Sequence, residues 1–233
     1  MRRLLALLVA TMTTVALVVS AAPAGAEGPA RVKELQRRLN DLGCDAGPAD
    51  GAVGRWTRSG VIRFQTRHGM RQTGRMTKNV RKRILSDKAK RCDRRPVPAR
   101  SGHGRRIVIS QGQNWVWLIG PRGTVIEQSG MIDLPSELRK GSHRTGSYCG
   151  RAARIKRNSN HGGNLWLPNF VRFAPCGIGF HRIPLYKSNG RQIHPDWYLG
   201  TNFDRSHGCI RLSGPMSQKV WNFTRRATTV RVL

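Results

Sequence analysis

The stretch Ser206–Leu212 reads Ser-His-Gly-Cys-Ile-Arg-Leu and holds one cysteine between a histidine and an arginine. A thiol is an effective nucleophile only as the thiolate, which needs a nearby base or positive charge. His207 and Arg211 each lie two residues from Cys209. Gly208 lets the backbone turn tightly, so that amides can point at a developing oxyanion. These features indicate that Cys209 is the nucleophile of an acyl transfer.

A histidine that could serve as the base lies earlier in the chain. The run Gly177-Ile178-Gly179-Phe180-His181 is predicted to be a strand that ends in a histidine. A side chain at the end of a strand can be held rigidly in a pocket. His181 and Cys209 would then form a nucleophile-base pair, oriented by a third acceptor that the sequence does not reveal.

The residues around these two segments predict a mostly-β domain over residues 106–233. β-branched and aromatic runs alternate with Gly and Pro, and Gly120-Pro121-Arg122-Gly123 is typical of a hairpin turn. One helix is expected from Gly214 to Thr224, with Ser213 as its N-cap. The expected strands cover residues 107–109, 115–119, 124–126, 165–173, 177–181 and 228–233.

Together, the Gly177–His181 and Ser206–Leu212 segments resemble the catalytic domain of YkuD-type L,D-transpeptidases. Arg144-Thr145-Gly146-Ser147-Tyr148 is similar to the Thr-Gly strand that precedes them in that family. The resemblance implies that Cys209 is the nucleophile and His181 the proton donor and acceptor. It places His207 beside them in the catalytic motif, and it implies that Ser206, Gly208 and Arg211 shape the substrate pocket and oxyanion site.

One spacing departs from the family pattern. Cys209 follows His181 by 28 residues, which is longer than the compact form of the family, whereas it follows His194 by 15. We prefer His181, because Gly-Phe-His on a strand matches the family context and His194 precedes Pro195 in a turn-like, charged insert. His194 stays the alternative base. His143 and His161 are interpreted as ordinary polar residues of Gly- or Asn-rich loops.

The resemblance also implies a reaction. The Cys209 thiolate would attack the carbonyl of the third residue of a peptidoglycan tetrapeptide stem, at its bond to the terminal D-alanine. His181 would pass a proton to the leaving amine. An amine on a neighbouring stem would then resolve the acyl-enzyme into a 3-3 cross-link, without a cofactor. Water as acceptor would make the same site an L,D-carboxypeptidase, and the sequence specifies neither the acceptor nor the third stem residue.

The N-terminal part of the chain predicts a second, helical domain over residues 30–86. Val32, Leu35, Leu39 and Leu42 fall on one helical face that ends at Gly43, and further helices are expected from Trp56 to near Gly69 and from Thr77 to Leu85. The spaced motifs of this part resemble the three-helix peptidoglycan-binding domain found beside many wall hydrolases. They are Leu35-Gln36, Leu42-Gly43, Asp50-Gly51-x-x-Gly54-x-x-Thr57, Phe64-Gln65 and Gly69-Met70-x-x-x-Gly74. The whole chain is therefore predicted to be α+β and multidomain.

Residues 87–105 join the two domains as a basic linker that also contains Pro96 and Pro98. We expect the stretch from Asp93 to Gly104 to act as the hinge.

Cysteine usage fits an oxidising compartment. The chain has five cysteines, and an odd number in a secreted chain leaves at least one thiol unpaired. Four cysteines allow three pairings. We favour Cys44 with Cys92 and Cys149 with Cys176, because each pair then stays within one proposed domain.

The N-terminus and the charge bear on where the protein acts. Residues 1–26 are predicted to be a signal peptide, because two arginines precede an apolar run and a small-residue site follows it. The apolar run is too short to remain in the membrane as an anchor.

The chain has 42 Lys and Arg against 12 Asp and Glu, a formal charge of +30. Export argues against a nucleic-acid partner, so this charge either attracts anionic wall polymers or is an ordinary solvated basic surface. Peptidoglycan stems and glycan are the other expected partners. We expect a monomer associated with the cell wall.

Two other interpretations of Cys209 fit the sequence. His181, His207 and Cys209 are all of zinc-ligand type, but His-x-Cys alone is weak support for a metal site. Alternatively, Cys209 is a buried structural thiol and the protein binds the wall without catalysis.

Overall fold

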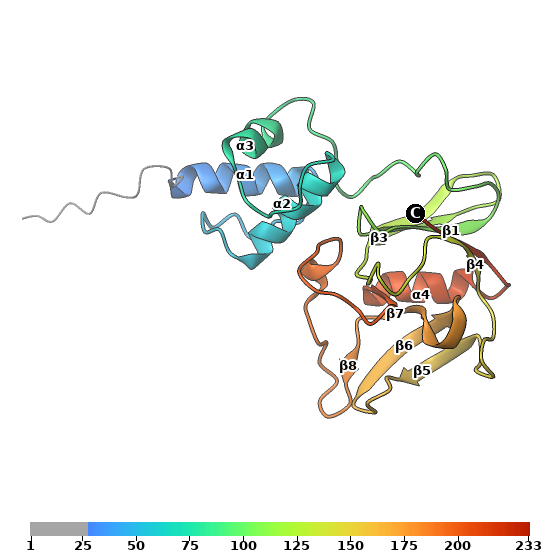
Figure 1. The fold of residues 1–233 in the computed structure, drawn as a ribbon. Coiled ribbons are helices and arrows are strands. Elements are labelled where there is room, and N and C mark those ends of the chain that lie inside the picture. The colour runs from blue at the N-terminus through green and yellow to red at the C-terminus, as the bar shows by residue number, and fades with distance from the viewer. Residues whose placement is uncertain (1–27) are drawn as a thin grey trace, which may run out of the picture.

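The computed structural model describes residues 28–233, apart from the side chain of Cys176. The predicted signal peptide lies outside the described residues. A helical unit at the N-terminal end and a unit of two β-sheets lie next to each other and are joined by the chain around residue 95 (Figure 1). No helix in residues 28–233 is long and apolar enough to cross a lipid bilayer.

The helical unit contains α1 (Pro29–Asp41), α2 (Arg55–Arg67) and α3 (Lys78–Ile84). The helix α1 ends where the sequence predicts, because Gly43 adopts a φ of +68° and the Cys44 amide donates to the Leu39 carbonyl at 2.8 Å. Thr77 caps α3 by accepting from the Val80 amide. The apolar faces of the helices meet in one core that includes Leu35, Leu39, Val61, Phe64, Val80 and Ile84.

A disulfide closes this unit. Cys44 and Cys92 are bonded across 48 residues of sequence, which confirms the first predicted pairing. The Cys92 amide also donates to the Leu42 carbonyl at 2.8 Å, so the chain after α3 is held against the end of α1. The second predicted pairing, Cys149 with Cys176, involves a side chain outside the described part and stays a prediction.

The β unit consists of two five-stranded sheets. The first sheet has the order β3-β2-β1-β10-β4, and the second has β5-β6-β7-β9, with β8 paired to β6. The strand bounds are β1 Arg106–Ser110, β2 Trp115–Ile119, β3 Val125–Gly130, β4 Gly141–Arg144, β5 Arg154–Ser159, β6 Leu165–Arg172, β7 Gly179–Arg182, β8 Leu185–Tyr186, β9 Ile210–Leu212 and β10 Thr229–Val232.

The two sheets share one core with the helix α4 (Gly214–Phe223). Ile107 and Val230 of the first sheet, Val171 and Phe180 of the second, and Val220 of α4 belong to a single buried apolar cluster. In the ribbon, α4 lies between the sheets (Figure 1). The predicted cap of this helix is confirmed, because Ser213 accepts a hydrogen bond from the Met216 amide. The α+β architecture expected from the sequence is therefore the observed one.

Four strands escape the sequence prediction. They are β4, β5, β8 and β9. The strand β5 reads Arg-Ile-Lys-Arg-Asn-Ser and is half-exposed, so it carries no apolar alternation, and β8 and β9 span two and three residues. His143 lies in β4 and not in a loop as expected. The strand expected at residues 177–181 begins only at Gly179, because Gly177 is the last residue of a short 3-10 turn, η1 (Pro175–Gly177).

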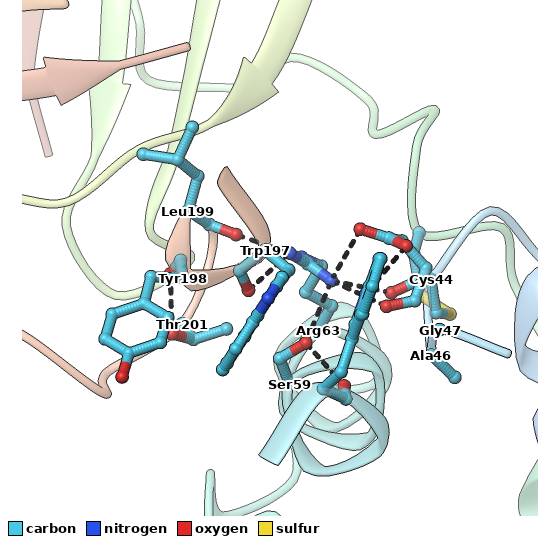
Figure 2. Close-up of polar contacts among 12 residues, drawn as sticks. Cys44, Ala46, Gly47, Ser59, Arg63, Trp197, Tyr198, Leu199 and Thr201 are labelled. Carbon is cyan, nitrogen blue, oxygen red and sulfur yellow. Dashed lines mark hydrogen bonds and ion pairs between the residues drawn. A yellow bond between two sulfur atoms is a disulfide. The ribbon is translucent and has the colours of Figure 1, made fainter. Parts of the chain in front are cut away.

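Arg63 of α2 fixes the two units to each other. The residue is 6% exposed, and its guanidinium donates to four backbone carbonyls, two in each unit. The acceptors are Leu199 at 2.9 Å and Trp197 at 2.7 Å, beside Cys44 at 2.9 Å and Asp45 at 3.1 Å. Figure 2 shows the guanidinium between these two backbone segments. Burial lowers the pKa of Arg63 to about 10, so the group stays charged at neutral pH.

Further contacts join the two units. Trp56 of α2 stacks on Trp197 with ring centroids 6.2 Å apart. The Gln72 side chain donates to the Gly112 carbonyl at 3.0 Å, and the Asn202 side chain donates to the Gln72 carbonyl at 3.2 Å. Polar contacts of this kind fix a docking angle more than they add stability, because each replaces a bond to water.

The linker also takes part in this docking. Arg95 is buried, donates to the Cys92 carbonyl at 3.0 Å and the Gln113 carbonyl at 2.9 Å, and lies over the Trp115 ring at 4.0 Å. The expected hinge is therefore packed at Arg95, between the helical unit and β2.

Replacing Arg63 with Ala should release the two units from each other. Four backbone carbonyls lose a charged donor, so we expect a loss of about 2–4 kcal/mol in the free energy of unfolding and faster tryptic cleavage within residues 93–104. Arg58→Ala is the matched control, because Arg58 is exposed on the same helix. Equal cleavage rates and equal stability in the two variants would contradict the docking role of Arg63.

Candidate active site

A cavity of about 1230 Å³ lies over one face of the sheet β5-β6-β7-β9. Five of the predicted site residues line it, namely His181, Ser206, His207, Cys209 and Arg211. The sixth, Gly208, lies in the turn between two of these residues. The structure thus brings together side chains from two segments that are 28 residues apart in sequence.

The register of β7 and β9 explains why these side chains share one face. The strands are parallel, with Phe180 opposite Ile210 and His181 opposite Arg211. Phe180 and Ile210 point into the shared core. Because successive side chains of a strand alternate between faces, His181 and Arg211 point to the cavity instead.

The thiol of Cys209 lies against the turn that precedes β7. Its Sγ donates to the Gly177 carbonyl at 3.4 Å. Burial raises the pKa of Cys209, while the Gly179 amide and the charges of Arg172 and Arg211 act in the opposite direction. Among the cysteines whose side chains the structure describes, Cys209 is the free one.

The turn before Cys209 requires glycine. Gly208 has a φ of +108°, and a Cβ there would lie 3.2 Å from the Cβ of Glu137. The Ser206 hydroxyl accepts from the Gly208 amide at 2.9 Å, and the Ser206 amide donates to the Asp133 carbonyl at 3.2 Å. The Gly208 amide is thus engaged within the turn, so Ser206 and Gly208 shape the backbone that presents the thiol.

His181 has the acceptor that the sequence could not reveal. Its Nδ1 is 2.5 Å from the backbone carbonyl of Arg182. A carbonyl only accepts, so Nδ1 carries the proton and Nε2 is left as the basic nitrogen. Burial, with a smaller effect from the charge of Arg211, lowers the pKa of His181 to about 4. The imidazole is therefore neutral at physiological pH and can accept a proton.

The alternative base, His194, lies beside the cavity and not on its lining. His194 is not one of the described residues that line the cavity. Its Nδ1 is 3.1 Å from the Pro195 carbonyl, its ring stacks on Tyr198 with centroids 5.2 Å apart, and its Nε2 is 3.9 Å from a carboxylate oxygen of Asp204. This placement favours His181 as the partner of Cys209.

Three residues near the site were not predicted from the sequence. Asp204 accepts from Arg211 at 2.7 Å and so fixes its guanidinium. Asp133 is buried beside the Ser206 turn, and burial raises its pKa to about 6. Arg172, the last residue of β6, lines the cavity. The only signal for Arg172 is a single cation in a strand whose other residues are uncharged, and Asp204 and Asp133 have no motif of their own.

The cavity is cationic. Arg151, Arg172 and Arg211 line it, and the described lining residues include no Asp or Glu. His207 is exposed at its edge, and His161, which was interpreted as an ordinary loop residue, also lines it. Within residues 28–233, no group of three or more His, Cys, Asp and Glu side chains is arranged to hold a metal ion.

The protonation states predict how Cys209 reacts. With the pKa of the thiol raised and that of His181 lowered, the resting pair is a neutral thiol and a neutral imidazole. Alkylation of Cys209 by iodoacetamide should then rise roughly tenfold per pH unit between pH 6 and 8, following the thiolate fraction. Mass spectrometry of the Cys209 peptide measures this rate. A rate independent of pH from 5 to 8 would instead indicate a preformed thiolate-imidazolium pair and contradict this assignment.

One family model matches the helical unit. Residues 29–84 match the model described as Putative peptidoglycan binding domain, which confirms the resemblance expected for this part of the chain. No curated protein matches the chain in sequence.

Among solved structures, the chain is similar to an L,D-transpeptidase from Xylanimonas cellulosilytica, with 19% identity and a TM-score of 0.49 over 87% of this chain and 92% of that one. It is similar to an L,D-transpeptidase from Stackebrandtia nassauensis, with 19% identity and a TM-score of 0.46 over 91% and 94% of the two chains. A fused zinc-dependent amidase/peptidase with a peptidoglycan-binding domain from Clostridium acetobutylicum has 16% identity and a TM-score of 0.42 over 88% and 96%. Identities this low leave the chemistry to be argued from this chain's own residues.

Proposed function

We propose that this protein is a peptidoglycan L,D-transpeptidase in which Cys209 is the nucleophile and His181 the general base and acid. The observation that carries the proposal is the common face of β7 and β9, from which His181 and Cys209 line one cavity. The Ser-His-Gly-Cys-Ile-Arg-Leu segment, with its resemblance to the L,D-transpeptidase motif, supports acyl transfer as the chemistry.

The proposed reaction begins with a proton transfer. Nε2 of His181 takes the thiol proton as the sulfur of Cys209 attacks the carbonyl of the third stem residue. The Gly179 amide and the charges of Arg172 and Arg211 stabilise the negative sulfur during this step. The Arg182 carbonyl holds the Nδ1 proton and so stabilises the imidazolium that forms.

The acyl-enzyme then forms and is resolved. The carbon-nitrogen bond to the terminal D-alanine breaks, and the imidazolium gives its proton to the leaving amine, which leaves a thioester on Cys209. A side-chain amine of a second stem attacks the thioester, releases the thiol and forms the 3-3 cross-link. Hydrolysis of the same thioester would be the carboxypeptidase reaction, and the cavity of about 1230 Å³ has room for the second stem that transpeptidation needs.

The helical unit supports the choice of polymer. It matches a peptidoglycan-binding family and is held to the catalytic unit by Arg63, so both units can contact the same wall polymer in a fixed geometry. The formal charge of +30 adds non-specific attraction to anionic wall polymers. We place the protein outside the cytoplasm and on the cell wall, with stem peptides and glycan as its partners.

Acylation by a carbapenem tests this proposal. The purified mature protein should gain one adduct per chain, and peptide mapping should place it on Cys209, because the β-lactam carbonyl is attacked as the stem carbonyl would be. Intact-mass spectrometry measures the gain. Folded, reduced protein that forms no adduct and does not turn over tetrapeptide stems would contradict an enzymatic role.

Matched variants assign the individual roles. Cys209→Ala should form no adduct yet still sediment with purified cell walls, because wall binding belongs to the helical unit. His181→Ala should slow acylation roughly 10²- to 10⁴-fold, while His194→Ala should stay within a few-fold of the unmodified protein. The reverse order of the two histidine variants would assign the base to His194.

A further inference from the structure

Arg172 is a buried cation that the proposed reaction leaves without an assigned contact to substrate. It is 2% exposed, and its Nη1 has no hydrogen-bond partner among the described residues. Its Nε donates to the Ala152 carbonyl at 3.3 Å, and its guanidinium lies 5.0 Å from the centre of the Phe170 ring. A buried guanidinium nitrogen without an acceptor is costly, so the site is incomplete until an acceptor arrives.

The sheet aims this cation at the reacting thiol. Arg172 lies opposite Gly179 in the pairing of β6 and β7. Extending the parallel register of β7 and β9 by one residue places Cys209 on the other side of Gly179. Arg172, Gly179 and Cys209 thus form one row across the cavity face, with the outer two backbones roughly 10 Å apart.

Gly179 makes room in this row for the Phe170 ring. A Cβ on Gly179 would lie 2.7 Å from that ring and 2.7 Å from the Val171 carbonyl. The ring therefore packs over Gly179, beside the Arg172 guanidinium. The charge of Arg172 acts on Cys209, which agrees with the placement of both residues in one row.

The proposed substrate carries an anion close to the carbonyl that Cys209 attacks. When Cys209 attacks the carbonyl of the third stem residue, the carboxylate of the terminal D-alanine lies one residue beyond the attacked carbon. No Asp or Glu is among the described lining residues, so the cavity offers no competing anion to Arg172. A guanidinium pairs with a carboxylate through charge-assisted hydrogen bonds.

We propose that Arg172 binds the terminal carboxylate of the leaving residue and selects stems that end in a free carboxylate one residue after the attacked carbonyl. This inference rests on the proposed function. It assigns Arg172 as a specificity-determining residue, distinct from Arg211, whose guanidinium is already held by Asp204.

Two synthetic stems test the assignment. They are the same tetrapeptide, ending in D-alanine with a free carboxylate or with a carboxamide. The protein should turn over the carboxylate at least about tenfold faster, in kcat/KM, than the carboxamide. The amine of D-alanine amide is less basic than that of D-alanine and is therefore the better leaving group. Leaving-group chemistry alone would favour the carboxamide stem, so faster turnover of the carboxylate stem would come from the site.

Substitutions then locate the preference. Arg172→Gln should lower kcat/KM for both stems, because the charge of Arg172 also stabilises the thiolate, and the loss for the carboxylate should be about 10- to 100-fold greater than the loss for the carboxamide. Arg172→Lys should restore part of the loss. Arg151→Gln is the control, because Arg151 is an exposed cation of the same cavity, and it should keep the preference.

Three other outcomes would contradict either this inference or the proposed function. Equal turnover of the two stems by the unmodified protein overturns this inference but not the proposed function, and it does so even if Arg172→Gln fails to fold. An equal loss on both stems in folded Arg172→Gln indicates a structural or thiol-activating role and also overturns it. No turnover of either stem and no carbapenem adduct would overturn the proposed function, and this inference with it.

Discussion

The parallel pairing of β7 with β9 is the constraint on which the candidate site depends. Phe180, Ile210 and Leu212 are buried in the core between the two sheets, and that burial fixes which face of each strand is turned outward. A shift of one residue would turn His181 into the apolar core and Phe180 out of it, so the register is protected by the hydrophobic effect. The chemistry uses the opposite face of the same strands, where His181, Cys209 and Arg211 line the cavity.

The chain between β7 and β9 contacts the helical unit. The long interval between His181 and Cys209 contains β8 and the 3-10 turn η2 (Asp196–Tyr198), and the Trp197 and Leu199 carbonyls of this segment accept from Arg63. The Gly200 amide then donates to the Met131 carbonyl at 3.1 Å, which returns the segment to the β unit. The extra residues thus contact the helical unit without moving Cys209, since β9 still pairs with β7.

Much of this arrangement could be predicted from the sequence, for identifiable reasons. The helices of residues 28–86, the Ser213 cap and the Cys44–Cys92 bridge follow from periodicity, capping residues and domain boundaries. The docking through Arg63 could not be predicted, because its acceptors are backbone carbonyls that carry no side-chain signature. Arg172 and the Arg182 carbonyl were missed for a related reason, since their roles come from strand register and not from a local motif.

In the proposed reaction a stem peptide becomes covalently attached to Cys209. The most direct measurement is rapid acid quenching of the protein with a tetrapeptide stem, followed by mass mapping of the Cys209 peptide. We expect a transient mass increase equal to the tripeptide acyl group on Cys209, formed as free D-alanine appears. Release of D-alanine with no acyl group on Cys209 at any time, or with the group on another residue, would contradict it.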